Sequence, residues 1–131
     1  MNNIHVDCVL DAKANLGEGP IWSIKDQNLY WVDINNCQLC KFNPVNGENI
    51  TINVGKPIGC FAIKKNLNII LALTNGFFEL NQNDKSMNFI NNPETNILDN
   101  RFNDGTVDLK GRFYAGTMPI SGSNINSKPK G

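Results

Sequence analysis

The sequence contains a repeat of strand-like segments that is longer than any single turn or hairpin. The segments "LYWVDI", "IILALT" and "RFYAGT" occupy equivalent places in successive units, and their central residues Trp31, Leu71 and Tyr114 are 40 and 43 positions apart. Each complete unit holds about four short strands. A period of about 40–45 residues with four strands is typical of a β-propeller blade, so the sequence predicts an all-β fold. The "GH…WD" signature of WD40 blades does not occur.

Short runs of aromatic and β-branched residues, separated by turn residues, define the individual strands. The 23 asparagines gather mainly between these runs, where their side chains can mimic a backbone turn. The predicted strands are 4–10, 20–24, 29–34, 38–43, 49–54, 59–63, 69–74, 77–82, 86–91, 105–109 and 112–118.

The number of strands gives about two and a half blades: two complete units and a third that stops after its second strand. Propellers close with roughly 4–8 blades. We therefore expect residues 1–131 to be the N-terminal part of one propeller domain, truncated relative to a complete ring, with the remaining blades required for closure. Residues 4–10 belong to none of the three units, and we expect them to complete the last blade of the whole protein.

Composition excludes several classes of partner. Twelve basic residues balance twelve acidic ones without a basic run, so nothing favours nucleic acid or a membrane surface. The N-terminus lacks the features of a signal peptide, which predicts a cytoplasmic protein with reduced cysteines.

The pair Cys37 and Cys40 has metal-site spacing, but positions i and i+3 of a strand face opposite sides, so we expect packing thiols there.

Two polar segments are candidates for a functional site. In "LGEGP", Glu18 precedes the innermost predicted strand and could bind a hard cation, although these residues alone favour an exposed loop acid. In "NRFNDG", an extended backbone would place Arg101 and Asn103 on one side and Phe102 on the other. That pair suits a polyhydroxy or carboxylate ligand. The alternative is an ordinary Asn-Asp-Gly turn.

Eight aromatic residues on the strands are expected to form blade core: Trp22, Tyr30, Trp31, Phe61, Phe77, Phe78, Phe113 and Tyr114.

The motifs "LGEGPIW", "LYWVDI", "NRFNDGTVDLKGRFYAGTM" and "KPKG" resemble, in this order, the SMP-30/gluconolactonase/luciferin-regenerating enzyme family. The resemblance implies a six-bladed propeller of about twice this length. It also implies that Glu18 is a metal ligand, that Arg101 and Asn103 contact substrate, and that Asp104, on the other side of the strand, has a structural role. Some relatives place an acidic residue shortly after "AGTM", where this chain has 119–121, "PIS".

The function implied by the resemblance is hydrolysis of small sugar lactones with a divalent metal ion. Calcium is favoured, with zinc, magnesium or manganese as alternatives. The remaining ligands and the general base are expected in later blades, so we expect no catalytic residue within this chain. The alternative is a non-catalytic calcium- or sugar-binding propeller, or an inactive truncated paralogue.

Overall fold

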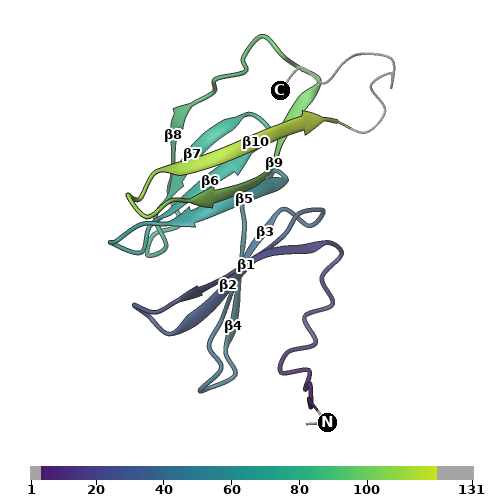
Figure 1. Ribbon diagram of the computed structural model, residues 1–131, viewed down its shortest axis with the longest axis vertical. Coiled ribbons are helices and arrows are strands. Elements are labelled where there is room, and N and C mark those ends of the chain that lie inside the picture. Colours follow the sequence, from purple (N-terminus) through teal and green to yellow (C-terminus); the bar gives the residue numbers. More distant parts are fainter. Residues whose placement is uncertain (1–3, 121–131) are drawn as a thin grey trace.

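The computed structural model describes residues 4–120, and every regular element within that range is a β-strand (Figure 1). The described part contains no helix that is long and apolar enough to span a membrane. The ten strands are β1 (Gly17–Ser23), β2 (Asn28–Asp33), β3 (Gln38–Phe42), β4 (Asn49–Asn53), β5 (Ile58–Ile63), β6 (Ile69–Leu73), β7 (Gly76–Leu80), β8 (Met87–Asn91), β9 (Asn100–Val107) and β10 (Phe113–Pro119).

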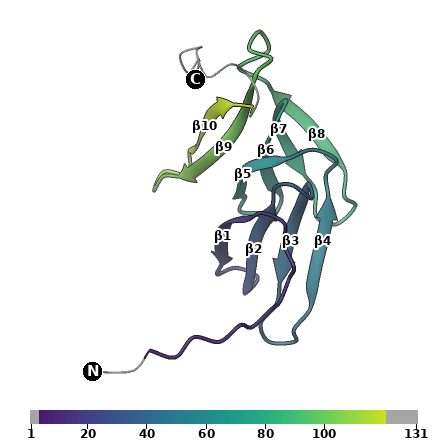
Figure 2. The same cartoon turned by 90° about the vertical axis from the view of Figure 1, so that its right-hand side faces the viewer.

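The strands form three antiparallel sheets in which neighbours in sequence are neighbours in space. Two sheets have four strands, in the orders β1-β2-β3-β4 and β5-β6-β7-β8, and the third pairs β9 with β10. Figure 2 shows the sheets fanned out, with β1, β5 and β9 on the same side of the molecule. This arrangement confirms the predicted all-β propeller fold, with two complete blades and half of a third.

Ten of the eleven predicted strands are present, some with shifted ends. The strand predicted for 4–10 does not form, and that segment extends away from the sheets (Figure 2) with Ile4 and Val6 at least 85% exposed. The strand predicted at 105–109 begins instead at Asn100, because 100–102 pair with the end of β10. The polar segment is therefore part of a strand rather than a turn.

Asparagine side chains shape the turns between strands, as the sequence predicts. Asn43 Oδ1 accepts a hydrogen bond from the backbone N–H of Val45 at 2.9 Å, and the same two-residue pattern recurs along the chain. It occurs at Asn46, Asn53, Asn66, Asn81 and Asn92. These local bonds satisfy backbone donors at the ends of the strands.

Apolar side chains fill the spaces between successive blades. The larger cluster joins the first two sheets, and its fully buried members include Tyr30, Leu39 and Leu71. A smaller cluster joins the second and third sheets around Phe102, whose ring centroid lies 4.6 Å from that of Phe77. Each blade is thus stabilised mainly by burial against its neighbour.

The prediction for the aromatic residues is correct only in part. Tyr30 and Phe61 are buried, whereas Trp22 and Tyr114 are 45% and 50% exposed. Trp22 lies on the innermost strand and lines an open cavity instead of packing between sheets. Position within the blade, rather than residue type, decides the burial of these side chains.

A polar cluster links the first blade to the second at one edge of the apolar core. The Tyr30 hydroxyl donates to Asp26 Oδ2 at 2.7 Å, and the Lys41 ammonium lies 2.9 Å from the same oxygen. The side-chain amide of Gln82, from the second blade, is 3.3 Å from the Tyr30 hydroxyl. Burial alone would raise the pKa of Asp26, but hydrogen bonds from Ser23, Tyr30 and Lys41 and the Lys41 charge lower it to about 2.

We expect Asp26→Asn to lower the free energy of unfolding of the full-length protein by about 2 kcal/mol at neutral pH. The folded pKa of about 2 is below the unfolded value of 3.8. The stabilisation is therefore complete above pH 3.8 and is lost as the pH falls toward 2. Denaturant unfolding of both proteins between pH 7 and pH 3 measures the difference. Asp11→Asn, which removes an exposed ion pair with Lys13, is the control and should change little. A stability difference for Asp26→Asn that stayed constant across this range would contradict the assignment.

Candidate functional site

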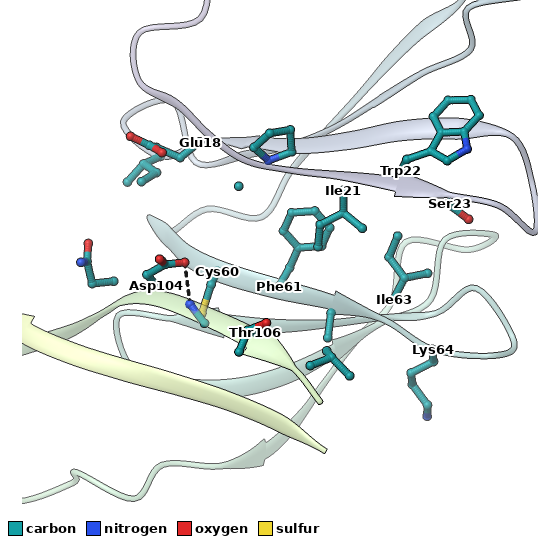
Figure 3. Close-up of a pocket in the computed structure, with 18 of the residues that line it drawn as sticks. Glu18, Ile21, Trp22, Ser23, Cys60, Phe61, Ile63, Lys64, Asp104 and Thr106 are labelled. Atoms are coloured by element: carbon teal, nitrogen blue, oxygen red, sulfur yellow. Dashed lines mark hydrogen bonds between the residues drawn. The ribbon is translucent and has the colours of Figure 1, made fainter. Parts of the chain in front are cut away.

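The innermost strands of the three sheets line a common cavity. It has a volume of about 1200 Å³ and is bordered by residues of β1, β5 and β9 and of the turns that follow β1 and β5. Figure 3 shows Glu18 and Asp104 at one end of this cavity, and Trp22 and Lys64 at the other. Strands from three separate blades therefore contribute to one surface.

Each of these inner strands carries a one-residue bulge beside the cavity. On β1 the register shifts between Glu18 and Ile21, where Gly19 has a φ of +60°. On β5 the shift lies at Gly59, and on β9 it falls between Phe102 and Gly105. Bulges are common next to active sites because they re-aim side chains without ending the strand. The bulges give the cavity wall its irregular outline.

Glu18 lies on β1 immediately before its bulge and is exposed to the cavity. Among residues 4–120, its carboxylate has no hydrogen-bond or ion-pair partner. A free carboxylate beside a cavity suits a hard cation, which prefers oxygen ligands. Within the same residues no group of three or more His, Cys, Asp or Glu side chains is placed to hold a metal. Glu18 thus fits as one ligand of a metal site that needs further ligands.

Arg101 and Asn103 line the same cavity from β9, as the extended backbone predicts. The half-buried Arg101 donates from Nη1 to the carbonyl oxygen of Phe102 at 3.0 Å. The amide of Asn103 is exposed and, within the described range, has no side-chain partner. Phe102 points the other way and is only 5% exposed in the core. Two hydrogen-bonding groups therefore face the cavity on a strand anchored by a buried aromatic ring.

The expected placement of Asp104 on the opposite side of the strand is wrong. Asp104 also lines the cavity, because the bulge adds one residue between Phe102 and Gly105 and so breaks the alternation. Its Oδ1 accepts a hydrogen bond from the N–H of Gly105 at 2.7 Å (Figure 3), which agrees with the expected structural role of Asp104 at Gly105. A second carboxylate therefore lies at the same end of the cavity as Glu18.

Two of the four cysteines, Cys40 and Cys60, are buried. Chain positions 8, 37, 40 and 60 all hold free thiols, and Cys37 lies in a turn whereas Cys40 lies on β3. Burial and the charge of Asp33 raise the pKa of Cys40 to about 11. Burial and the charge of Asp104 raise the pKa of Cys60, beside the cavity, to about 12. A thiol with such a pKa is almost entirely protonated near neutral pH, so the structure gives no support for thiolate chemistry.

Gly59 determines how closely the third blade approaches the second. A methyl group at this position would lie 2.8 Å from the backbone nitrogen of Asn103, and closer still to the carbonyl group of Phe102. No real Cβ atom tolerates such distances to backbone. The strand that carries Arg101 and Asn103 therefore depends on the absence of a side chain at this position, which the sequence alone does not reveal.

We expect Gly59→Ala to lower the free energy of unfolding by about 3 kcal/mol, because β9 must move away from β5. The matched control is Gly116→Ala on β10, where the nearest atom outside the neighbouring residues, the carbonyl oxygen of Asp104, is 3.9 Å from the new methyl group. Chemical denaturation of the full-length variants measures both effects. Equal stability of the two variants would show that β9 is not packed against Gly59 as described.

Comparisons with known proteins agree with this geometry. The model of the SMP-30/gluconolactonase/LRE-like region matches residues 16–130. Regucalcin from Xenopus laevis is 37% identical over 118 residues, which cover 90% of this chain and 40% of that protein. A 6-deoxy-6-sulfogluconolactonase from Pseudomonas putida is 35% identical over 116 residues, 88% of this chain and 40% of the relative.

Solved structures show the same fold. A luciferin-regenerating enzyme matches 81% of this chain and 37% of its own, with a TM-score of 0.76 and 28% identity. A calcium-binding regucalcin from Agrobacterium tumefaciens matches 79% of this chain and 35% of its own, with a TM-score of 0.74 and 22% identity. The all-strand blades are thus those of a β-propeller. The chain belongs to the SMP-30/gluconolactonase/LRE-like family, and it spans about 40% of the length of the curated relatives it matches.

Proposed function

We propose that the full-length protein, of which residues 1–131 form the N-terminal part of a single propeller domain, is a divalent-metal-dependent lactonase acting on small sugar lactones. The observation that carries the proposal is the convergence of Glu18, Arg101 and Asn103 on one cavity from two different blades. The similarity to a protein named as a sulfogluconolactonase supports the class of reaction. A cytoplasmic location is part of the same proposal, and free thiols at the four cysteines are what that compartment favours.

Glu18 would supply one carboxylate ligand to the metal ion. Calcium is the leading candidate because a structural relative is described as calcium-binding, and zinc, magnesium or manganese would also accept this oxygen. The bound ion would polarise the lactone carbonyl and acidify a bound water molecule. The other ligands and the general base would come from the part of the protein that this chain does not span, since the described residues supply no group of three.

Arg101 and Asn103 would orient the substrate. The guanidinium presents several N–H donors in a fixed fork, and the amide presents both a donor and an acceptor. Hydroxyl groups of a sugar can pair with both kinds of group, whereas Ile21 supplies apolar surface in the same cavity. Holding the lactone in one orientation near the metal reduces the entropic cost of reaction.

The test is hydrolysis of gluconolactone by the full-length protein, followed by proton release before and after removal of divalent metal with a chelator. We expect turnover that is lost with the chelator and restored by added calcium or another divalent ion. Turnover that a chelator leaves unchanged would contradict the proposed mechanism.

A non-catalytic, metal- or sugar-binding propeller is the second candidate. It is favoured because the described part of the cavity holds only two acids, the unpaired Glu18 and Asp104. These do not make a complete set of metal ligands. The two functions differ in the same assay. A full-length protein that binds calcium in a titration but hydrolyses none of a panel of aldonolactones would support binding without catalysis.

We expect Arg101→Ala and Asn103→Ala in the full-length protein to reduce kcat/KM by about 10- to 100-fold, the range for loss of hydrogen bonds to charged or buried polar groups. Metal affinity should remain unchanged, because neither side chain is a proposed ligand. Lactonase kinetics and calcium titration of each variant measure the two quantities separately. The control is Asn88→Ala on β8, on the exposed outer strand of the second blade. Loss of calcium affinity in Arg101→Ala would contradict the assigned role.

A further inference from the structure

Asp33 is a buried carboxylate that the proposed mechanism does not use. It ends β2, is only 2% exposed, and has no cationic partner among residues 4–120. Removing a carboxylate from water costs several kcal/mol unless hydrogen bonds compensate for the lost hydration. The hydrogen-bond partners of the Asp33 carboxylate therefore indicate what this buried charge does.

The hydrogen bonds of Asp33 reach the segment that leads directly to Glu18. Its Oδ2 accepts from the backbone N–H of Asn15 at 2.9 Å, and its Oδ1 accepts from that of Leu16 at 3.1 Å. On the other side, Asn36 donates from its side-chain amide at 2.7 Å and from its backbone N–H at 3.3 Å. Burial alone would raise the pKa of Asp33, but the bonds from Asn15, Leu16 and Asn36 hold it below its ordinary value.

The segment that enters β1 pairs regularly with the end of β2 as far as Glu18. Immediately after Glu18 the regular pairing is interrupted. Ile34 N–H donates to the carbonyl oxygen of Leu16 at 2.9 Å, and Gly17 pairs with Asp33. The bulge then begins after Glu18, where the register to β2 shifts. The backbone groups just before the proposed metal ligand are therefore held by hydrogen bonds to the residues at the end of β2.

We propose that Asp33 is a positioning residue for Glu18, holding the incoming chain so that the Glu18 carboxylate stays at the cavity wall. The inference rests on the proposed metal site. Leu16 is two residues before Glu18, and the intervening Gly17 pairs with Asp33 itself, so the bonds of Asp33 hold the start of the strand that carries the carboxylate. Metal sites are sensitive to such support, and loss of an outer-shell partner typically costs 10- to 100-fold in affinity.

The test compares Asp33→Asn with Asp26→Asn in the full-length protein, by calcium titration calorimetry and thermal unfolding. An asparagine at 33 can still accept one backbone N–H, but its amide group would face the other donor. Asp26 is the matched control, because it is also a hydrogen-bonded acid of the first blade with a mostly buried side chain, but its partners are Tyr30 and Lys41 rather than the segment before Glu18. We expect both variants to be less stable, and only Asp33→Asn to bind calcium about 10- to 100-fold more weakly. Unchanged calcium affinity in folded Asp33→Asn would overturn the inference.

A second measurement uses the wild-type protein and so does not depend on the folding of any variant. Because coupling between sites is reciprocal, calcium should increase the protection of the Asn15 and Leu16 amides against hydrogen exchange. Calcium binding without any change at these two amides would overturn the role of Asp33 while leaving the lactonase proposal intact. A wild-type protein that bound no divalent ion would overturn both.

Discussion

Replacing Glu18 with glutamine in the full-length protein is expected to weaken divalent-metal binding by at least about 100-fold. It should also reduce lactone turnover by about 1000-fold or more, because metal polarisation supplies several kcal/mol of transition-state stabilisation. The substitution preserves the size of a side chain that is exposed to the cavity, so the fold should not change. Calcium titration calorimetry, combined with lactonase kinetics at saturating metal, measures both effects.

Glu48→Gln is the matched control for this substitution. Glu48 lies exposed immediately before β4 and does not line the cavity. It should retain the metal affinity and the turnover of the wild type. If Glu18→Gln bound calcium as tightly as the wild type, the role assigned to the most specific residue of the "GEGP" motif would be wrong.

The 131-residue chain by itself is expected to show no lactonase activity above the uncatalysed rate. Calcium sites use six to eight oxygen ligands, and the described cavity offers only the carboxylates of Glu18 and Asp104. Among residues 4–120 no group of three or more potential ligand side chains is placed to hold a metal. The chain also spans only about 40% of the length of its curated relatives.

The measurement is gluconolactone hydrolysis by purified residues 1–131, with calcium, magnesium, manganese or zinc added in turn. The full-length protein under the same conditions is the positive control. Metal-dependent hydrolysis by the short chain would show that its own residues complete the site, and would contradict the requirement for later blades.

The blade pattern could be predicted from the sequence because its causes are local. Alternating apolar residues define each strand, and asparagines such as Asn43 close the turns through bonds to residues two positions ahead. The choice of Arg101 and Asn103 as residues on one side of a strand also followed from local alternation, and both line the cavity. Most features that a single strand or turn defines by itself could therefore be predicted from the sequence.

The remaining features depend on contacts between distant segments. The position of Asp104 was predicted wrongly, because a bulge is defined by the register between two strands and leaves no mark in the alternation of one. The exposure of Trp22 depends on its place on the inner strand. The missing strand at 4–10 depends on a partner edge, which the described residues do not provide. Gly59 is required by the close approach of Phe102, more than 40 positions away in sequence.

The most direct test of the proposed site is a crystal structure of the full-length protein with calcium and a non-hydrolysable sugar analogue. We predict a calcium ion about 2.3–2.6 Å from a carboxylate oxygen of Glu18. We also predict that Arg101 and Asn103 donate hydrogen bonds to the hydroxyl groups of the analogue. A calcium ion bound elsewhere, with Glu18 facing solvent and the analogue outside the cavity lined by β1, β5 and β9, would contradict the account.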